Sequence, residues 1–263
     1  MHAVDEFARA KTAGRKISIV TAYDAWSARL VARSNVDAIL VGDSAAMVIH
    51  GHDTTLPATL SLMAMHTRAV ARAADGKLVI ADLPFLSYRK GVPAAMTAVG
   101  VLVRSGAHAI KLEGVDGHED VIRQIVGSGV PVMGHLGLTP QSINQLGGFR
   151  VQGRTDVDAA KLIVQAHELE RLGCFSIVLE CVPAALAARI TSEVTIPTIG
   201  IGAGAGTDGQ VLVLQDLWGV DSGPSPRFVR QYVDGETVLT SALNQYDADV
   251  KDTRFPAPEE SYS

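Results

Sequence analysis

Cysteine is nearly absent from this chain of 263 residues, which contains only Cys174 and Cys181. Their spacing matches neither a Cys-x-x-Cys motif nor a framework of paired disulfides. Small secreted domains usually depend on several disulfides, whereas proteins of the reducing cytoplasm rarely contain any. We therefore expect a soluble, cytoplasmic protein.

The sequence also lacks long apolar runs and clusters of basic residues. No apolar run approaches the roughly 18 residues that a membrane-spanning helix needs. The segment from Asp5 to Arg9 is charged, where a signal peptide would have its apolar core. The formal net charge is -5, and no block of about five basic residues occurs. Nucleic acids and anionic membranes attract basic proteins, so we expect this chain to bind neither.

What the chain does contain is a regular alternation of apolar strand patterns and amphipathic helix patterns. Hydrophobic residues make up 47% of the chain, which is enough for a large core. Short apolar, β-branched runs predict strands that are buried on both faces. The expected strands are 17–24, 38–44, 77–82, 108–113, 130–135, 175–180 and 195–201. The expected helices are 25–33, 60–74, 93–104, 118–126, 156–172 and 183–193, with a long loop at 136–155. Residues 210–214 fit either a strand or a helix.

Alternating strands and helices predict a parallel sheet that is covered by helices. Seven or eight such units in roughly 220 residues suit a closed (β/α)8 barrel, and an open doubly wound sheet is the alternative. We expect a single barrel domain over residues 1–263. Its last part is expected to form terminal helices within about 226–246, at 227–233 and 237–246, and a polar tail at about 247–263.

Polar side chains gather where the expected strands end. In chain order these are Asp43 and Ser44, then Asp82, then Lys111 and Glu113, then His135, and finally Glu180. For any one of these residues, an equally good explanation is that the strand stops at a polar residue because loops are polar. In a parallel barrel, however, all these strand ends meet at one rim, where the active sites of such barrels are built. The succession of polar ends therefore predicts an active site.

Three of these acids, Asp43, Asp82 and Glu113, bring carboxylates together without cysteine or a cluster of histidines. This set of ligands favours a hard cation that binds oxygen, such as magnesium. Magnesium takes only one or two direct protein carboxylates and keeps water or substrate oxygens as its other ligands. One of the three acids is therefore free to bind through water.

Lys111 and Glu113 share a face of their strand, because residues two apart point the same way. The pair fits a salt bridge, or a lysine that neutralises a substrate carboxylate or enolate oxygen beside a cation-binding glutamate. Glu180, on a later strand, is a candidate general base for removing a proton next to a carbonyl. His135 fits a substrate hydrogen bond and a structural role equally well. Cys181 alternates to the face opposite Glu180 and is expected to pack rather than react.

Several longer segments form an ordered pattern that is specific because of its combined length. They are Thr21–Asp24, Val41–Ser44, Gly51–Pro57, Ala81–Phe85, Lys111–Gly114, Gly134–Gln141, Val151–Arg154, Leu179–Pro183 and Ile199–Gly204. In these segments the chain resembles the ketopantoate hydroxymethyltransferase family, also called 3-methyl-2-oxobutanoate hydroxymethyltransferases. The resemblance covers about residues 17–235.

The resemblance implies a (β/α)8 barrel of the phosphoenolpyruvate/pyruvate superfamily. It implies transfer of a hydroxymethyl group from 5,10-methylenetetrahydrofolate to α-ketoisovalerate (3-methyl-2-oxobutanoate) through a magnesium-stabilised enolate. The products are ketopantoate, for pantothenate synthesis, and tetrahydrofolate. Members of the family are cytoplasmic homo-oligomers, commonly homodecamers. By the family pattern, Asp43, Asp82 and Glu113 are expected to bind Mg²⁺, Asp43, Ser44, Asp82 and Lys111 to contact the ketoacid, and Glu180 to accept the proton.

The chain departs from the family pattern in the loop that follows Asp43. Ala45-Ala46 stands where many members have a larger residue and glycine, and His50 stands where glutamine is common. These changes concern the loop conformation and the folate contacts rather than the metal carboxylates. One alternative is another magnesium-dependent 2-oxoacid lyase or mutase of the same superfamily, but such enzymes tend to carry a catalytic loop cysteine. The other is a non-catalytic ligand-binding barrel, against which the intact rim acids argue.

Overall fold

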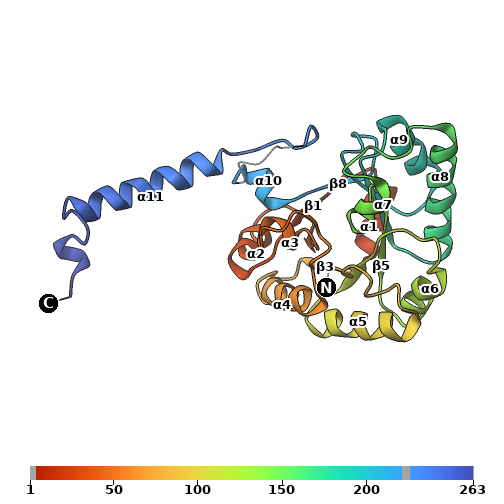
Figure 1. Cartoon of the computed structure of the whole chain (residues 1–263), viewed down its shortest axis with the longest axis horizontal. Coiled ribbons are helices and arrows are strands. Elements are labelled where there is room, and N and C mark those ends of the chain that lie inside the picture. Colours follow the sequence, from red (N-terminus) through yellow and green to blue (C-terminus); the bar gives the residue numbers. More distant parts are fainter. Residues whose placement is uncertain (1–3, 221–225, 263) are drawn as a thin grey trace. The chain divides into compact units, whose positions relative to one another are not determined.

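The computed structural model describes residues 4–220 and 226–262, and the chain divides into two compact units at Leu214. In the unit that ends at Val213, eight parallel strands form a closed barrel, in which each strand pairs with the next and β8 pairs with β1 (Figure 1). The strands are β1 Ile17–Thr21, β2 Ala38–Val41, β3 Leu78–Asp82, β4 Ala109–Lys111, β5 Val132–Gly137, β6 Ser176–Glu180, β7 Thr198–Ile201 and β8 Gly209–Leu212. The predicted closed barrel is confirmed, and the open sheet is excluded.

Helices surround the strands of this unit (Figure 1). They are α1 Asp5–Thr12, α2 Ala25–Ala32, α3 Ala45–Val48, α4 Leu60–Ala71, α5 Val92–Arg104, α6 Glu119–Gly127, α7 Ile143–Leu146, α8 Asp156–Arg171 and α9 Ala184–Glu193, with the 3-10 helix η1 at Pro140–Ser142. Asp24, Thr59 and Thr155 each begin a helix, because their side chains accept hydrogen bonds from backbone N–H groups of the first turn.

The structure differs from the sequence prediction mainly in its short elements. Helices α1 and α3 were not predicted, and the expected loop at 136–155 contains η1 and α7. A four-residue helix is too short to show a helical period, so the sequence pattern could not reveal α3 or α7. The ambiguous segment 210–214 lies mostly in β8, and α10 begins at its last residue, Leu214.

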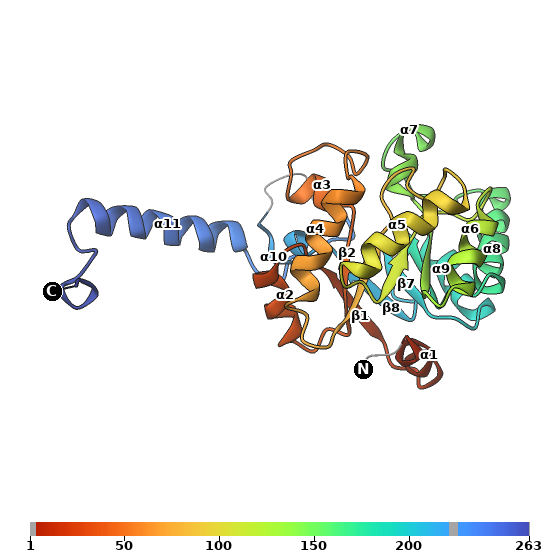
Figure 2. The ribbon, with the colours of Figure 1, turned by 90° about the horizontal axis from the view of Figure 1, so that it is seen from below.

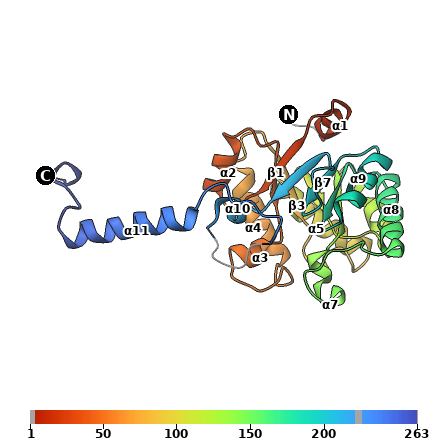
Figure 3. The same cartoon turned by 90° about the horizontal axis from the view of Figure 1, so that it is seen from above.

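Side chains that alternate along the strands fill the inside of the barrel. They form one core cluster of Phe7, Ala10, Ile17, Ile19, Ala38, Leu40, Leu78, Ile80, Ala109, Met133, Val178, Ile199 and Val211. Phe7 and Ala10 come from α1, which therefore closes the amino-terminal end of the barrel. Figures 2 and 3 show α1 at one end of the barrel and α3 and α7 at the other. Polar groups are thus left to occupy the carboxyl end.

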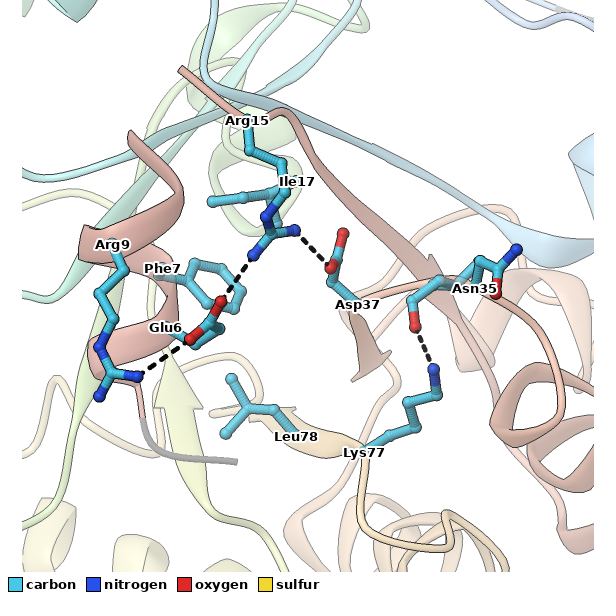
Figure 4. Close-up of a pocket in the computed structure, with 10 residues that line it drawn as sticks. Glu6, Phe7, Arg9, Arg15, Ile17, Asn35, Asp37, Lys77 and Leu78 are labelled. Carbon is cyan, nitrogen blue, oxygen red and sulfur yellow. Dashed lines mark hydrogen bonds and ion pairs between the residues drawn. The ribbon is translucent and has the colours of Figure 1, made fainter. Parts of the chain in front are cut away.

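A cavity of about 460 Å³ lies at the amino-terminal end, between α1 and the first residues of the strands (Figure 4). Arg15 joins its two sides, because its guanidinium lies 2.9 Å from Glu6 of α1 and 2.9 Å from Asp37, just before β2. Lys77 donates to two backbone carbonyls that precede β2. Arg15 and Lys77 already have partners within the chain. We therefore interpret the contacts at this end of the barrel as structural.

The second unit, from Leu214 onward, contains α10 Leu214–Trp218, α11 Gly235–Lys251 and the 3-10 helix η2 Pro258–Glu260. The predicted helix at 227–233 is wrong, since these residues form turns and extended chain. The predicted helix at 237–246 is confirmed but begins earlier, where Asp234 caps it, and it continues into the expected tail. Residues 1–3, 221–225 and 263 lie outside the described residues. In the described ranges, no helix has both the length and the apolar character needed to cross a membrane.

Candidate active site at the carboxyl ends of the strands

The structure brings all the predicted site residues to the carboxyl-terminal rim of the barrel. Three of them continue the inward-facing rows of the core, because Asp82 follows Ile80 by two residues, His135 follows Met133, and Glu180 follows Val178. Lys111 follows Ala109 in the same way. Asp43, Asp82, Lys111, Glu113 and His135 are all buried. The site is therefore the polar top layer of the hydrophobic barrel interior.

Asp43 and Asp82 are connected through the end of β2. The backbone N–H of Asp43 donates to Asp82 Oδ2 over 3.1 Å. Residue 42 is glycine, and a Cβ there would lie 2.7 Å from Ser44 Oγ, so a larger residue would displace the serine hydroxyl. The short sequence Gly42-Asp43-Ser44 thus fixes one carboxylate beside another.

Lys111 is the buried cation of the site. Its Nζ lies 2.9 Å from Asp82 Oδ1 and 3.4 Å from His135 Nδ1. Burial by itself lowers the pKa of Lys111, but the charges of Asp82, Asp43 and Glu113 outweigh this effect and raise the pKa above its usual value. The ammonium group therefore stays protonated and supplies a fixed positive charge inside the barrel.

One lysine does not neutralise the three buried acids around it. Burial raises the pKa of Asp82 to about 7, and the charge of Lys111 opposes this rise only in part. Burial also raises the pKa of Asp43 and raises that of Glu113 well above the usual range. The negative charge of a neighbouring carboxylate raises the pKa of each acid further. Additional positive charge at this rim would relieve the repulsion and favour the ionised acids.

The oxygen atoms of the rim offer places for a cation. Asp82 Oδ1 and Glu113 Oε1 are buried without an aligned hydrogen-bond donor, although Lys111 lies close to the former. Free carboxylate oxygens suit a hard divalent cation. In residues 4–220 and 226–262, no group of three or more His, Cys, Asp or Glu side chains is arranged so that it could hold a metal ion. The observation that fits a cation is thus the pair of unbonded oxygens on Asp82 and Glu113.

His135 lies between Glu113 and Glu180. Its Nε2 is 3.1 Å from Glu180 Oε2, and its Nδ1 is 3.6 Å from Glu113 Oε1. Burial lowers the pKa of His135, and the nearby Lys111 lowers it further, so the ring is neutral at pH 7. Because Lys111 can only donate, Nδ1 is the accepting nitrogen and Nε2 carries the proton that faces Glu180.

Glu180 is the acid of the rim with access to solvent. Its side chain is 16% exposed, compared with 2% for Glu113. Gly137 packs so tightly against the Glu180 carbonyl that a Cβ there would clash. Cys181 adopts a left-handed conformation, with φ of 48°, immediately after the glutamate. Such a backbone position in a residue other than glycine is sterically costly and is often found at functional sites.

Ser44 is half-buried at the same rim and receives support from Tyr23, which follows β1. Its Oγ lies 2.8 Å from the hydroxyl of Tyr23, which is 1% exposed. The Tyr23 backbone carbonyl is in turn bonded by His66 Nδ1 of α4 over 2.6 Å. The serine is therefore held in place by two neighbouring elements and still has an exposed side.

Sequence reasoning did not assign roles to Tyr23, Tyr88 or Gln141, which all bond to site residues. Tyr23 and Gln141 lie inside segments that carry the family resemblance, and this resemblance is the feature of the sequence that points to them. Tyr88 lies outside those segments, so only the fold reveals its place.

Cys181 is half-buried, and burial together with Glu180 raises the pKa of its thiol to about 11. The thiol is thus not an activated nucleophile at neutral pH.

A family model for ketopantoate hydroxymethyltransferase matches residues 2–258. The chain belongs to the ketopantoate hydroxymethyltransferase family. It is 56% identical to a 3-methyl-2-oxobutanoate hydroxymethyltransferase of Bdellovibrio bacteriovorus, over all of both chains. It is 53% identical to the enzyme of the same name from Coxiella burnetii, over 95% of each chain.

Solved structures of other proteins share the fold of this member of the ketopantoate hydroxymethyltransferase family. Phosphonopyruvate hydrolase matches with a TM-score of 0.63 at 12% identity, over 99% of this chain and 93% of its own. A 2,3-dimethylmalate lyase of the PEP mutase/isocitrate lyase superfamily matches with a TM-score of 0.59 at 16% identity, over 97% of this chain and 88% of its own. These likenesses support the predicted barrel fold.

Proposed function

We propose that this enzyme transfers a hydroxymethyl group from 5,10-methylenetetrahydrofolate to 3-methyl-2-oxobutanoate, giving ketopantoate for pantothenate biosynthesis. The relatives named for this reaction support it. The observation that carries it is the arrangement of Glu180, the partly exposed acid, against neutral His135 and beside the buried Lys111 cluster. A base next to concentrated positive charge is what proton removal adjacent to a carbonyl requires.

We propose Asp43, Asp82 and Glu113 as the residues that hold Mg²⁺. Their buried carboxylates, raised pKa values and unbonded oxygen atoms support this assignment. The three acids would hold the ion together, and one of them would be free to bind it through water. When bound, the ion supplies Lewis acidity toward the keto oxygen of the substrate.

The chain itself binds and orients the ketoacid in this proposal. Ser44 has an exposed side from which it can hydrogen-bond the substrate carboxylate, while Tyr23 holds it from behind. Lys111 provides positive charge where negative charge develops on the keto oxygen. Because the ammonium lies in a buried site, its interaction with that oxygen is much stronger than it would be in water.

Glu180 takes the proton from C3 of the ketoacid, and the electron pair of the broken C–H bond forms the enolate. The neutral His135 faces the glutamate, with its Nε2 3.1 Å from Glu180 Oε2, and brings no charge that would neutralise it. The enolate carbon then forms a bond to the one-carbon unit of the folate. The two bonds from the one-carbon unit to the folate nitrogens break, and water supplies the hydroxyl oxygen. The two nitrogens take up the proton held by Glu180 and the remaining proton of the water, so that tetrahydrofolate leaves and Glu180 is ionised again.

The test of the proposed function is a direct assay of the purified enzyme. Ketopantoate should form from 3-methyl-2-oxobutanoate and 5,10-methylenetetrahydrofolate, and chelation of divalent cations should stop the reaction until MgCl2 is added back. Activity that is indifferent to chelation would remove magnesium from the proposal. Failure to form ketopantoate under all these conditions would overturn the assigned reaction.

A further inference from the structure

Gln141 occupies an unusual position for a neutral side chain at this rim. It belongs to η1, in the loop that follows β5, and is only 7% exposed. Its Nε2 donates to Asp43 Oδ2 over 2.8 Å and to the Leu83 carbonyl over 2.9 Å. Its backbone N–H donates to Glu113 Oε2 over 2.9 Å. One residue therefore reaches the chain ends that follow β2, β3 and β4.

The contacts of Gln141 also determine the direction of its amide. The Tyr88 hydroxyl donates to Gln141 Oε1 over 3.1 Å, while both partners of Nε2 are oxygen atoms that can only accept. Rotating the amide by half a turn would place oxygen against the oxygens of Asp43 and Leu83. Both hydrogens of the amide nitrogen and the amide oxygen are thus matched with partners in one orientation only, which fixes the rotation of the Gln141 side chain.

Gln141 determines which carboxylate oxygens remain available. It bonds Oδ2 of Asp43 and Oε2 of Glu113, so Oδ1 of the aspartate and Oε1 of the glutamate are left unbonded by it. Glu113 Oε1 is buried without any aligned donor in the described structure. Gln141 therefore orients Asp43 and Glu113, which follow different strands. It leaves Oδ1 of the aspartate and Oε1 of the glutamate without a hydrogen bond to Gln141.

We propose that Gln141 is a positioning residue for the cation site, which sets the rotation of Asp43 and Glu113 and joins three strand ends at a fixed separation. The inference rests on the proposed function, because it assigns these two acids to the cation. Groups that orient metal ligands in this way typically change metal affinity by about 10- to 100-fold when they are removed. Gln141 does not touch the reacting atoms in this assignment.

The experiment replaces the amide while keeping the size of the side chain. Gln141→Met is compared with Gln145→Met, a matched change at an exposed position of α7 in the same loop. Mn²⁺ binding to the metal-free full-length protein is followed by loss of the free-ion electron paramagnetic resonance signal. We expect Gln141→Met to weaken Mn²⁺ binding by about 10- to 100-fold, and Gln145→Met to leave it unchanged.

A second variant addresses the chance that Gln141→Met does not fold. Tyr88→Phe keeps the glutamine but removes the hydroxyl that directs its amide. We expect Mn²⁺ affinity between those of wild type and Gln141→Met. A folded Gln141→Met protein should also regain kcat as the MgCl2 concentration is raised. If the substitution only destabilised the fold, the melting temperature would fall and the Mn²⁺ affinity of the folded fraction would stay unchanged.

The outcomes separate this inference from the proposed function. Wild-type Mn²⁺ affinity in folded Gln141→Met overturns the positioning role and leaves the proposed reaction standing. If that variant does not fold, unchanged Mn²⁺ affinity in Tyr88→Phe overturns the role instead. Wild-type protein that binds no Mn²⁺ and makes no ketopantoate contradicts the proposed function itself.

Discussion

His135 Nε2 lies 3.1 Å from Glu180 Oε2, and this contact links the carboxyl ends of the neighbouring strands β5 and β6. The ring is neutral because burial and Lys111 lower its pKa. A protonated histidine here would form an ion pair with the glutamate and weaken it as a base. The neutral ring instead faces the carboxylate without a charge of its own.

The first prediction concerns Glu180 as the base. Glu180→Gln should slow exchange of the C3 proton of 3-methyl-2-oxobutanoate with deuterated solvent by about 10²- to 10⁴-fold, because the amide cannot accept the proton. Exchange is measured by proton nuclear magnetic resonance in the presence of MgCl2 and without folate. Ketoacid binding should persist in the variant. Exchange at the wild-type rate would remove Glu180 from the role of base.

The second prediction concerns the carboxylates assigned to the cation. Asp43→Asn and Asp82→Asn should each weaken Mg²⁺-dependent ketoacid binding by more than about tenfold, since an amide is a poorer ligand for a hard cation. Titration calorimetry with MgCl2 and 3-methyl-2-oxobutanoate measures the effect. Asp53→Asn, in the exposed loop after α3, is the matched control and should bind as wild type does. Equal binding in all three variants would contradict the metal assignment.

The third prediction concerns the hydroxyl pair of Tyr23 and Ser44, which are 2.8 Å apart. Tyr23→Phe removes one hydrogen bond of about 0.5 to 1.5 kcal/mol, so KM for the ketoacid should rise by about 2- to 12-fold with a smaller effect on kcat. Ser44→Ala should raise KM at least as much. The double variant should be no worse than Ser44→Ala alone, because both changes remove one shared interaction. Fully additive effects would show that the two hydroxyls act independently.

The fourth prediction concerns the expected homo-oligomer, which remains a proposal. Leu239, Leu243, Tyr246 and Val250 share one face of α11 at spacings of four and three, and their exposed fractions run from 43% to 68%. Contiguous exposed apolar side chains on a helix usually mark an interaction surface. We expect wild type near 277 kDa by light scattering, which is ten chains of 27.7 kDa, and a smaller species for Leu243→Asp. Ser241→Asp, on the polar side of α11, is the control. A monomeric wild type would exclude the oligomer.

Much of the fold follows from local patterns that the sequence displays openly. Runs such as Ala38–Val41 and Leu78–Asp82 are buried on all sides, so the apolar residues that predict them are continuous. The helix caps at Asp24 and Thr155 are equally local. Short elements such as α3 and α7 escape prediction because they contain too few residues to show a period. Helix α11 extends past its predicted end because polar residues there continue an exposed face rather than stop the helix.

The sequence by itself determined which residues the site could use. Alternation along a strand places Asp82 on the face of Ile80, Lys111 on that of Ala109, His135 on that of Met133 and Glu180 on that of Val178. Because these strands are apolar on both faces, the closed barrel decides that this face is the inward one. Only the tertiary structure decided which oxygen meets which nitrogen, because those contacts join residues separated by whole strand–helix units. Gln141 and Asp43 are 98 positions apart, yet their side chains lie 2.8 Å apart in a buried network. Local pattern carries no information about such a distance, since barrel closure alone brings the strand ends together.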